Sequence, residues 1–128
     1  MEKKEKYQIA SSVNEGILEI ILTGEEAEHT CEKIKKDIDN IIITNNVKNI
    51  LIDCRALKGR IGITKTYERV RSYPPEIYKH NFALVDLPEN AEYQKFHETT
   101  AQNAGQRLKF FTDIDDARAW LKSKPKKS

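Results

Sequence analysis

The spacing of apolar and polar residues predicts a hairpin at the start of the chain. Apolar and polar residues alternate between Tyr7 and Val13, which indicates a strand with one buried face. The turn signal Asn-Glu-Gly at 14–16 is followed at once by an apolar run from Ile17 to Leu22. Two strands joined by so short a turn form an antiparallel pair, so we expect a β-hairpin.

A helix is predicted after the hairpin. The segment from Thr23 to Glu26 has the Thr-x-x-Glu pattern of a capping box, which favours a helix start. Five residues then recur at helical spacing and define one buried stripe: Ala27, Cys31, Ile34, Ile38 and Ile41. The Asn45-Asn46 pair is expected to end this helix.

The middle of the chain predicts a buried strand, a basic loop and a short helix. The strand spans Asn49 to Asp53 and is followed by a glycine-containing loop. The helix should begin near Thr64 and bring Tyr67 and Val70 inward. It should end before the prolines at 74–75, since proline cannot continue the hydrogen-bond ladder.

The last third of the chain repeats the strand–helix order twice. A buried strand is predicted from Phe82 to Asp86, and Asn90 can cap the helix that follows. Gly105 is the expected residue just beyond the end of that helix. The final strand spans residues 107–111, and a second capping-box pattern at 112–115 opens the final helix.

These elements predict one α/β domain. After the hairpin every strand is followed by a helix, and such crossovers require parallel pairing. We therefore expect a mixed sheet of about five strands with about four helices over residues 7–122. Residues 1–6 are predicted to be a disordered N-terminus, and residues 123–128 a basic tail.

Composition and charge narrow the class of protein. Hydrophobic residues make up 38% of the chain and charged residues 33%, which is typical of a globular domain. A net charge of +2 does not favour nucleic acid as a partner. No apolar run is long enough for a transmembrane segment, and none follows the charged N-terminus as in a signal peptide. Together with only two cysteines, Cys31 and Cys54, this predicts a cytoplasmic protein with reduced thiols.

Three segments resemble the STAS domain family, whose members include anti-sigma-factor antagonists. They are the hairpin leading into a helix, the run Ile-Leu-Ile-Asp at 50–53 that enters a loop and a short helix, and the ending Phe-Phe-Thr-Asp-Ile-Asp-Asp-Ala-Arg-Ala-Trp-Leu at 110–121. The last segment is similar to a divergent STAS-like branch akin to CRAL-TRIO lipid-binding domains. The resemblance covers about Tyr7 to Leu121 and implies a STAS-like fold and a regulatory, protein-binding role.

The resemblance fails at the regulatory serine. In the regulatory members of this family, a serine at the start of the helix after the central strand is phosphorylated. The family's Asp-Ser pair falls on Ile61 and Gly62 here, and neither residue can accept a phosphate. Thr64 and Thr66 lie nearby, but the sequence does not say whether either is phosphorylated.

The loop after the central strand is the predicted binding site. Basic side chains and glycines just before a helix N-terminus suit an anionic group or the surface of a partner. The predicted site residues are Asp53, Arg55, Lys58, Gly59, Arg60, Gly62 and Thr64. The function predicted from them is a non-enzymatic regulatory or interaction module, with a protein partner or, in the simplest oligomer, a second copy of the chain in a homodimer.

Two alternatives remain open. Aromatic residues of the later helices could line a pocket for a small hydrophobic or lipid-like ligand: Tyr67, Tyr78, Tyr93 and Phe96. Separately, Cys54 and Arg60 have the Cys-x5-Arg spacing of cysteine phosphatases, in which a thiolate attacks phosphorus beside an arginine. The competing interpretation of Cys54 is a buried structural thiol. No catalytic residue set, metal site or cofactor motif is predicted.

Overall fold

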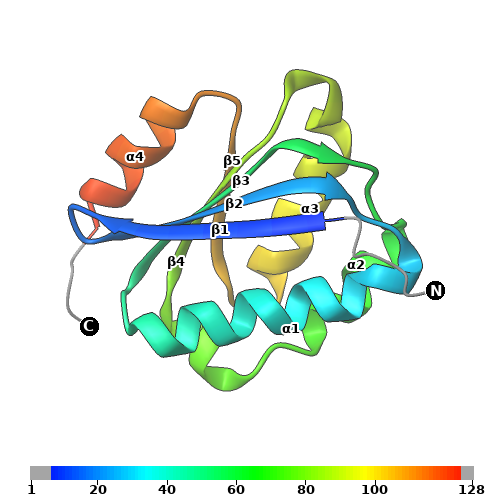
Figure 1. Ribbon diagram of the computed structural model, residues 1–128, viewed down its shortest axis with the longest axis horizontal. Helices are drawn as coiled ribbons and strands as arrows, with labels where there is room; N and C mark the ends of the chain where they lie inside the picture. Colours follow the sequence, from blue (N-terminus) through cyan, green and yellow to red (C-terminus); the bar gives the residue numbers. More distant parts are fainter. Residues whose placement is uncertain (1–6, 125–128) are drawn as a thin grey trace.

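Residues 7–124 are described by a computed structural model, in which five strands form one mixed sheet (Figure 1). The strands lie in the order of the chain: β1 (Tyr7–Asn14), β2 (Ile17–Glu25), β3 (Asn49–Lys58), β4 (Asn81–Val85) and β5 (Arg107–Phe111). β1 and β2 pair antiparallel, and the remaining pairs are parallel. The predicted hairpin and mixed sheet are therefore confirmed. The predictions for residues 1–6 and 125–128 lie outside the described residues.

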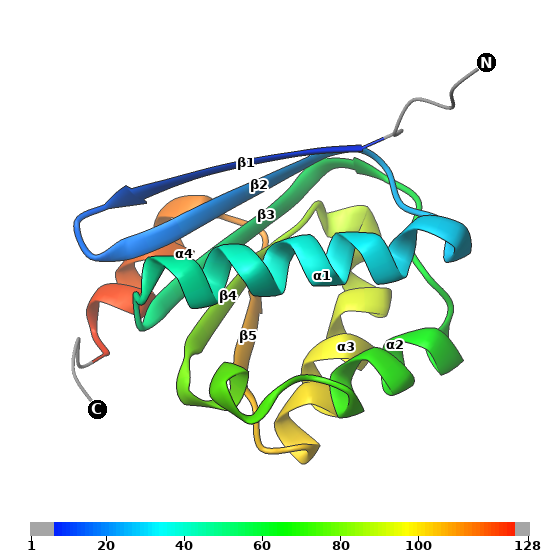
Figure 2. The ribbon, with the colours of Figure 1, turned by 60° about the horizontal axis from the view of Figure 1, so that its bottom comes forward.

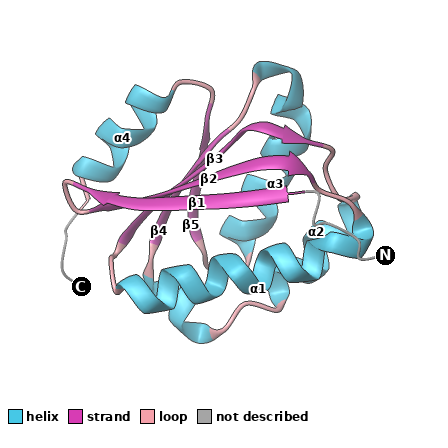
Figure 3. Cartoon of the chain, viewed as in Figure 1, coloured by secondary structure: helices cyan, strands magenta, loops and turns pink. Residues whose placement is uncertain are grey.

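Four α-helices flank this sheet within the described residues (Figures 2 and 3). They are α1 (Glu28–Asn45), α2 (Ile63–Arg71), α3 (Ala91–Asn103) and α4 (Ile114–Lys122). Two short 3-10 turns, η1 (Pro75–Lys79) and η2 (Pro88–Asn90), connect them to the strands. None of the helices in residues 7–124 is both long and apolar enough to span a membrane.

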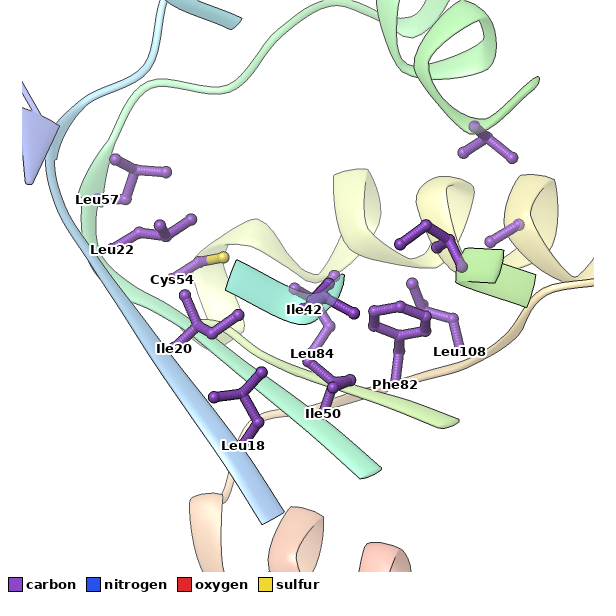
Figure 4. Packing of buried hydrophobic residues seen from close by; sticks show 13 residues of the cluster. Leu18, Ile20, Leu22, Ile42, Ile50, Cys54, Leu57, Phe82, Leu84 and Leu108 are labelled. Atoms are coloured by element: carbon purple, nitrogen blue, oxygen red, sulfur yellow. The ribbon is translucent and has the colours of Figure 1, made fainter. Parts of the chain in front are cut away.

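The two faces of the sheet bury separate apolar clusters. On one face, side chains such as Leu18, Ile50 and Phe82 pack against α1, α2 and α3 (Figure 4). On the other face, residues such as Leu51 pack against Leu121 of α4. Alternate residues of one strand thus enter different clusters, as the two-residue period of a strand requires. The larger cluster lies beneath the carboxyl ends of β3 and β4, where the predicted site begins.

The predicted capping box at residues 23–26 is wrong. β2 continues through this segment to Glu25, whose register partner is Lys58 of β3. The N-cap of α1 is Ala27, whose backbone N–H donates to Thr30 Oγ1 over 3.0 Å. A similar shift of one residue occurs at α4, where the side chain of Asp113 caps the helix. Local capping patterns are weak where strand pairing competes for the same backbone groups.

The central strand is longer than predicted. β3 does not end at Asp53 but runs to Lys58, because its last residues pair with the extended end of β2. The register between the two strands shifts between Ile21 and Thr23, which marks a β-bulge. Half of the predicted basic loop is therefore strand, and this changes where its side chains point.

Candidate functional site

A buried ion pair joins the predicted loop to the end of β4. The Arg60 guanidinium donates to both carboxylate oxygens of Asp86, with Nη2 2.8 Å from Oδ1 and Nε 3.1 Å from Oδ2. Its remaining N–H groups donate to backbone carbonyls, including those of Leu57 and Cys54. The Arg60 side chain is only 11% exposed and that of Asp86 is 0% exposed. Arg60 is thus turned into the protein rather than toward a ligand.

Asp86 is saturated with hydrogen bonds from the residues that follow it. The backbone N–H of Leu87 donates to Oδ1 over 2.8 Å, and the side chain of Asn90 donates to the same oxygen. Gln94 of α3 donates its Nε2–H to Oδ2 over 2.7 Å. One carboxylate therefore holds together the end of β3, the end of β4 and the first turns of α3.

This arrangement does not support the phosphatase interpretation. The Cys54 side chain is buried, and burial raises the pKa of its thiol well above the ordinary value of 9.0 despite the Arg60 charge nearby. A phosphate loop instead needs an exposed thiolate of lowered pKa. Arg60, which would hold the phosphate oxygens, is already bound to Asp86. Cys54 thus fits the competing interpretation of a structural thiol.

Asp53 and Arg55 lie on the opposite face of the sheet from Arg60. Their side chains form a bidentate ion pair, with Arg55 Nη2 2.8 Å from Asp53 Oδ2. Burial alone would raise the Asp53 pKa, but the hydrogen bonds from Arg55 outweigh it and keep that pKa below the ordinary value. Two further charges that act on Arg55, those of Arg118 and Asp113, belong to α4 and the turn before it. The structure thus separates this pair from the rest of the predicted site.

The remaining predicted residues are exposed where β3 ends and α2 begins. Lys58, Gly59, Gly62 and Thr64 all face solvent in this region. Two apolar side chains that the sequence analysis did not place there join them. Ile63, which is 63% exposed, and Tyr67, which is 50% exposed, are one helical turn apart on α2. We call Lys58, Gly62, Ile63, Thr64 and Tyr67 the β3–α2 surface.

The prediction that Tyr67 points inward is wrong because polar residues occupy the buried side of α2. Thr66 is buried, and its hydroxyl lies 2.7 Å from the Tyr93 hydroxyl. Arg69 reaches inward to the buried Glu26 carboxylate, 2.6 Å away. Burial opposes the charge of Arg69, but Glu26 outweighs it and raises the Arg69 pKa. Sequence reasoning assigned Glu26 to a helix cap and missed this ion pair.

A cavity of about 70 Å³ lies between the sheet and helices α1 to α3. Its walls are mainly apolar, and its polar lining includes Tyr93, Gln94, His97 and Gln106. Of the four aromatic residues predicted to line a pocket, Tyr93 lines this cavity. The other three do not: Tyr67 is exposed, Tyr78 donates its hydroxyl to the Val70 carbonyl, and Phe96 lies outside the lining.

His97 is the titratable group most affected by this environment. Burial lowers the pKa of its imidazole to about 4, and the positive charge of Arg69 acts in the same direction. Its Nδ1 lies 3.3 Å from Gln94 Oε1, whereas its buried Nε2 has no protein partner. The side chain is therefore neutral at physiological pH and is linked through Gln94 to Asp86.

We expect the fold to lose stability between pH 7 and pH 5 because of His97. Its folded-state pKa of about 4 lies below the ordinary value of 6.5, so in this window the unfolded chain binds a proton that the folded chain does not. The loss begins as the pH falls through 6.5 and reaches about 2 kcal/mol at pH 5. Urea denaturation at both pH values measures it, and His97→Gln should remove most of the difference.

His80 provides the control for this prediction. Burial also lowers its pKa, so it contributes in the same direction, but it is only partly buried and its ring contacts the carbonyl of Glu76. His80→Gln should therefore leave most of the pH dependence in place. If His97→Gln behaves like His80→Gln, the pH dependence has another origin.

Comparison with known proteins identifies the fold. No family model and no curated protein sequence matches the chain. An anti-sigma factor antagonist from Mycobacterium paratuberculosis superposes with a TM-score of 0.63 at 13% identity, covering 91% of this chain and 94% of that one. An uncharacterised protein from Shewanella loihica with a SpoIIAA-like fold gives a TM-score of 0.59 at 16% identity, covering 94% and 98%.

A third similar structure is the anti-sigma factor antagonist SpoIIAA in its unphosphorylated form. It superposes with a TM-score of 0.55 at 19% identity, covering 93% of this chain and 98% of that one. At such identities the likeness concerns the fold, and the strand order with its antiparallel hairpin and parallel remainder agrees with it. The chain is a STAS-like domain with the fold of the anti-sigma factor antagonists.

Proposed function

We propose that this chain is a non-enzymatic regulatory module that binds a protein partner through the β3–α2 surface. The observation that carries the proposal is the pair of exposed apolar side chains, Ile63 and Tyr67, at the start of α2. Exposed apolar residues that lie together often mark interaction surfaces. The protein partners implied by the names of the similar anti-sigma factor antagonists support the same kind of function.

The charges around this pair suggest the chemistry of the partner. The Arg71 guanidinium lies 5.1 Å from the centre of the Tyr67 ring, and Lys58 is exposed at the end of β3. A partner with an apolar patch rimmed by carboxylates would complement this surface. Arg55 and Arg60 contribute less than the sequence predicted, since each is already paired with a carboxylate of its own chain.

Binding in this proposal is not switched by phosphate at the position that the family resemblance indicates. Ile61 is buried, and Gly62 is the N-cap of α2 and has no side-chain oxygen. Thr64 is exposed in the first turn of α2, where a phosphate would meet free backbone N–H groups. Treatment of purified native protein with a phosphatase, followed by intact mass measurement, tests whether any residue carries a phosphate.

Site-specific photocrosslinking in the native host tests the surface. A photoreactive amino acid at position 63 should capture a protein that the same amino acid at position 43 does not. Ile43 is a matched control because it is 51% exposed on α1, away from α2. Capture at both positions, or at neither, would contradict the proposed surface.

Charge substitutions then measure the contribution of the apolar pair. We expect Ile63→Asp to weaken binding of the captured partner at least about 10-fold, because it places a carboxylate within an apolar contact. Ile43→Asp should leave the affinity unchanged, and both variants should unfold at the temperature of the wild type. Isothermal calorimetry with the purified partner gives the affinities.

A further inference from the structure

The cavity beneath α1 to α3 contains two buried polar atoms that lack a protein partner. They are Nε2 of His97 and Oε1 of Gln106, and both residues line the cavity. Gln106 is only 4% exposed, so its side chain is not simply turned to solvent. Nearly all buried polar atoms in proteins are hydrogen-bonded, so two unpaired atoms on one cavity are unusual.

The hydrogen bonds around His97 determine what Nε2 can do. Gln94 donates its Nε2–H to Asp86, which turns its amide oxygen toward His97. That oxygen can only accept, so His97 Nδ1 must carry the proton of the neutral imidazole. Nε2 then has a lone pair and accepts hydrogen bonds. Because Gln106 Oε1 is an acceptor as well, the cavity offers two acceptors and needs a donor.

The rest of the cavity defines the body of a ligand. Leu57, Leu84 and Leu108 are among the apolar side chains that form its walls. The volume of about 70 Å³ suits a molecule of a few non-hydrogen atoms and is too small for an acyl chain. An ion would lose its hydration in such surroundings, which favours an uncharged molecule.

We propose that this cavity binds a small neutral molecule that combines an apolar body with a hydrogen-bond donor, such as an aliphatic alcohol. The donor group would lie between His97 Nε2 and Gln106 Oε1. The proposal is independent of the β3–α2 surface, because none of the residues of that surface lines the cavity. It also narrows the ligand class that the aromatic residues suggested, from lipid-like molecules to small alcohols.

Butan-1-ol and diethyl ether provide a direct test. They share one molecular formula, but only the alcohol can donate a hydrogen bond. Titrations of methyl-labelled protein, followed by NMR, should show butan-1-ol shifting the methyl signals of the cavity leucines. We expect the alcohol to bind about 10-fold more tightly than the ether, as one satisfied hydrogen bond predicts.

Two variants assign the preference to the acceptors. Gln106→Leu removes one acceptor without adding a polar group and should reduce the alcohol-to-ether ratio several-fold. His97→Phe should do the same by removing the other acceptor, so the test does not depend on one variant folding. Gln8→Leu, at an exposed position of β1, should leave the ratio unchanged.

Three results would overturn the proposal. The first is a titration in which butan-1-ol leaves the cavity methyl signals unshifted, since the cavity would then hold only water. The second is equal binding of the alcohol and the ether. The third is a preference for the alcohol that persists in both Gln106→Leu and His97→Phe, because the donor would then be recognised elsewhere.

Discussion

Replacing Arg60 with methionine should lower the free energy of unfolding by about 3–5 kcal/mol, although Arg60 lies in a segment predicted to be a basic loop. The substitution leaves the Asp86 carboxylate fully buried without its cation. The donors that remain, from Leu87, Asn90 and Gln94, are neutral and cannot replace a positive charge. Urea denaturation at pH 7 measures the loss.

Arg55→Met is the matched control. Arg55 also forms a bidentate pair with an aspartate of β3, but its side chain is 39% exposed. Exposed pairs of this kind contribute less than about 1 kcal/mol, because solvent screens them and the side chains lose freedom on pairing. The double variant Arg60→Met/Asp86→Asn should recover part of the stability lost in Arg60→Met, since no buried charge remains unpaired. Equal losses at Arg55 and Arg60 would contradict the structure.

The contrast between these two arginines shows where sequence reasoning reached its limit. The apolar spacing of the strands was sufficient to predict the hairpin, the parallel strands and the order of elements. It did not reveal that β3 continues beyond Asp53, because residues 54–58 lack a continuous apolar run. Their strand conformation depends on pairing with β2, which is a long-range contact. The face on which each basic side chain lies follows from that pairing.

The buried side of α2 was hidden for a related reason. An apolar stripe is the usual signal of a buried helix face, and α2 instead buries Thr66 and Arg69 beside Val70. Each polar side chain is acceptable there because a partner from a distant segment satisfies it, Tyr93 for Thr66 and Glu26 for Arg69. Two charged residues 43 positions apart give no local pattern from which this pair could be predicted.

His97 illustrates the opposite case, in which the interpretation from sequence was close but incomplete. Its place on the apolar stripe of α3 indicated a packed histidine. The structure adds that only one ring nitrogen has a protein partner. The distinction requires knowing that Asp86 orients Gln94, a contact between the end of β4 and the first turns of α3. Hydrogen-bond direction therefore had to come from the three-dimensional arrangement.

The second large effect is expected at Gly59, where β3 ends beside Glu26. The backbone of Gly59 has φ of +78°, and a Cβ atom there would lie 2.6 Å from the Glu26 carbonyl oxygen. Glu26 cannot easily retreat, because its N–H donates to the Lys58 carbonyl over 2.8 Å and its side chain pairs with Arg69. Gly59→Ala should therefore cost about 2–4 kcal/mol, from the left-handed conformation and the close approach together.

Two other glycines separate these contributions. Gly105 has φ of +93°, but a Cβ atom added there would meet no atom within 4 Å, so Gly105→Ala should cost only about 1 kcal/mol of backbone strain. Gly62 has φ of −70° and equally open surroundings, so Gly62→Ala should change stability by less than about 0.5 kcal/mol. Urea denaturation of the three variants should rank them in that order. If Gly59→Ala is no more costly than Gly105→Ala, the ends of β3 and β2 do not approach as closely as described, and the buried Glu26–Arg69 pair would lose its support.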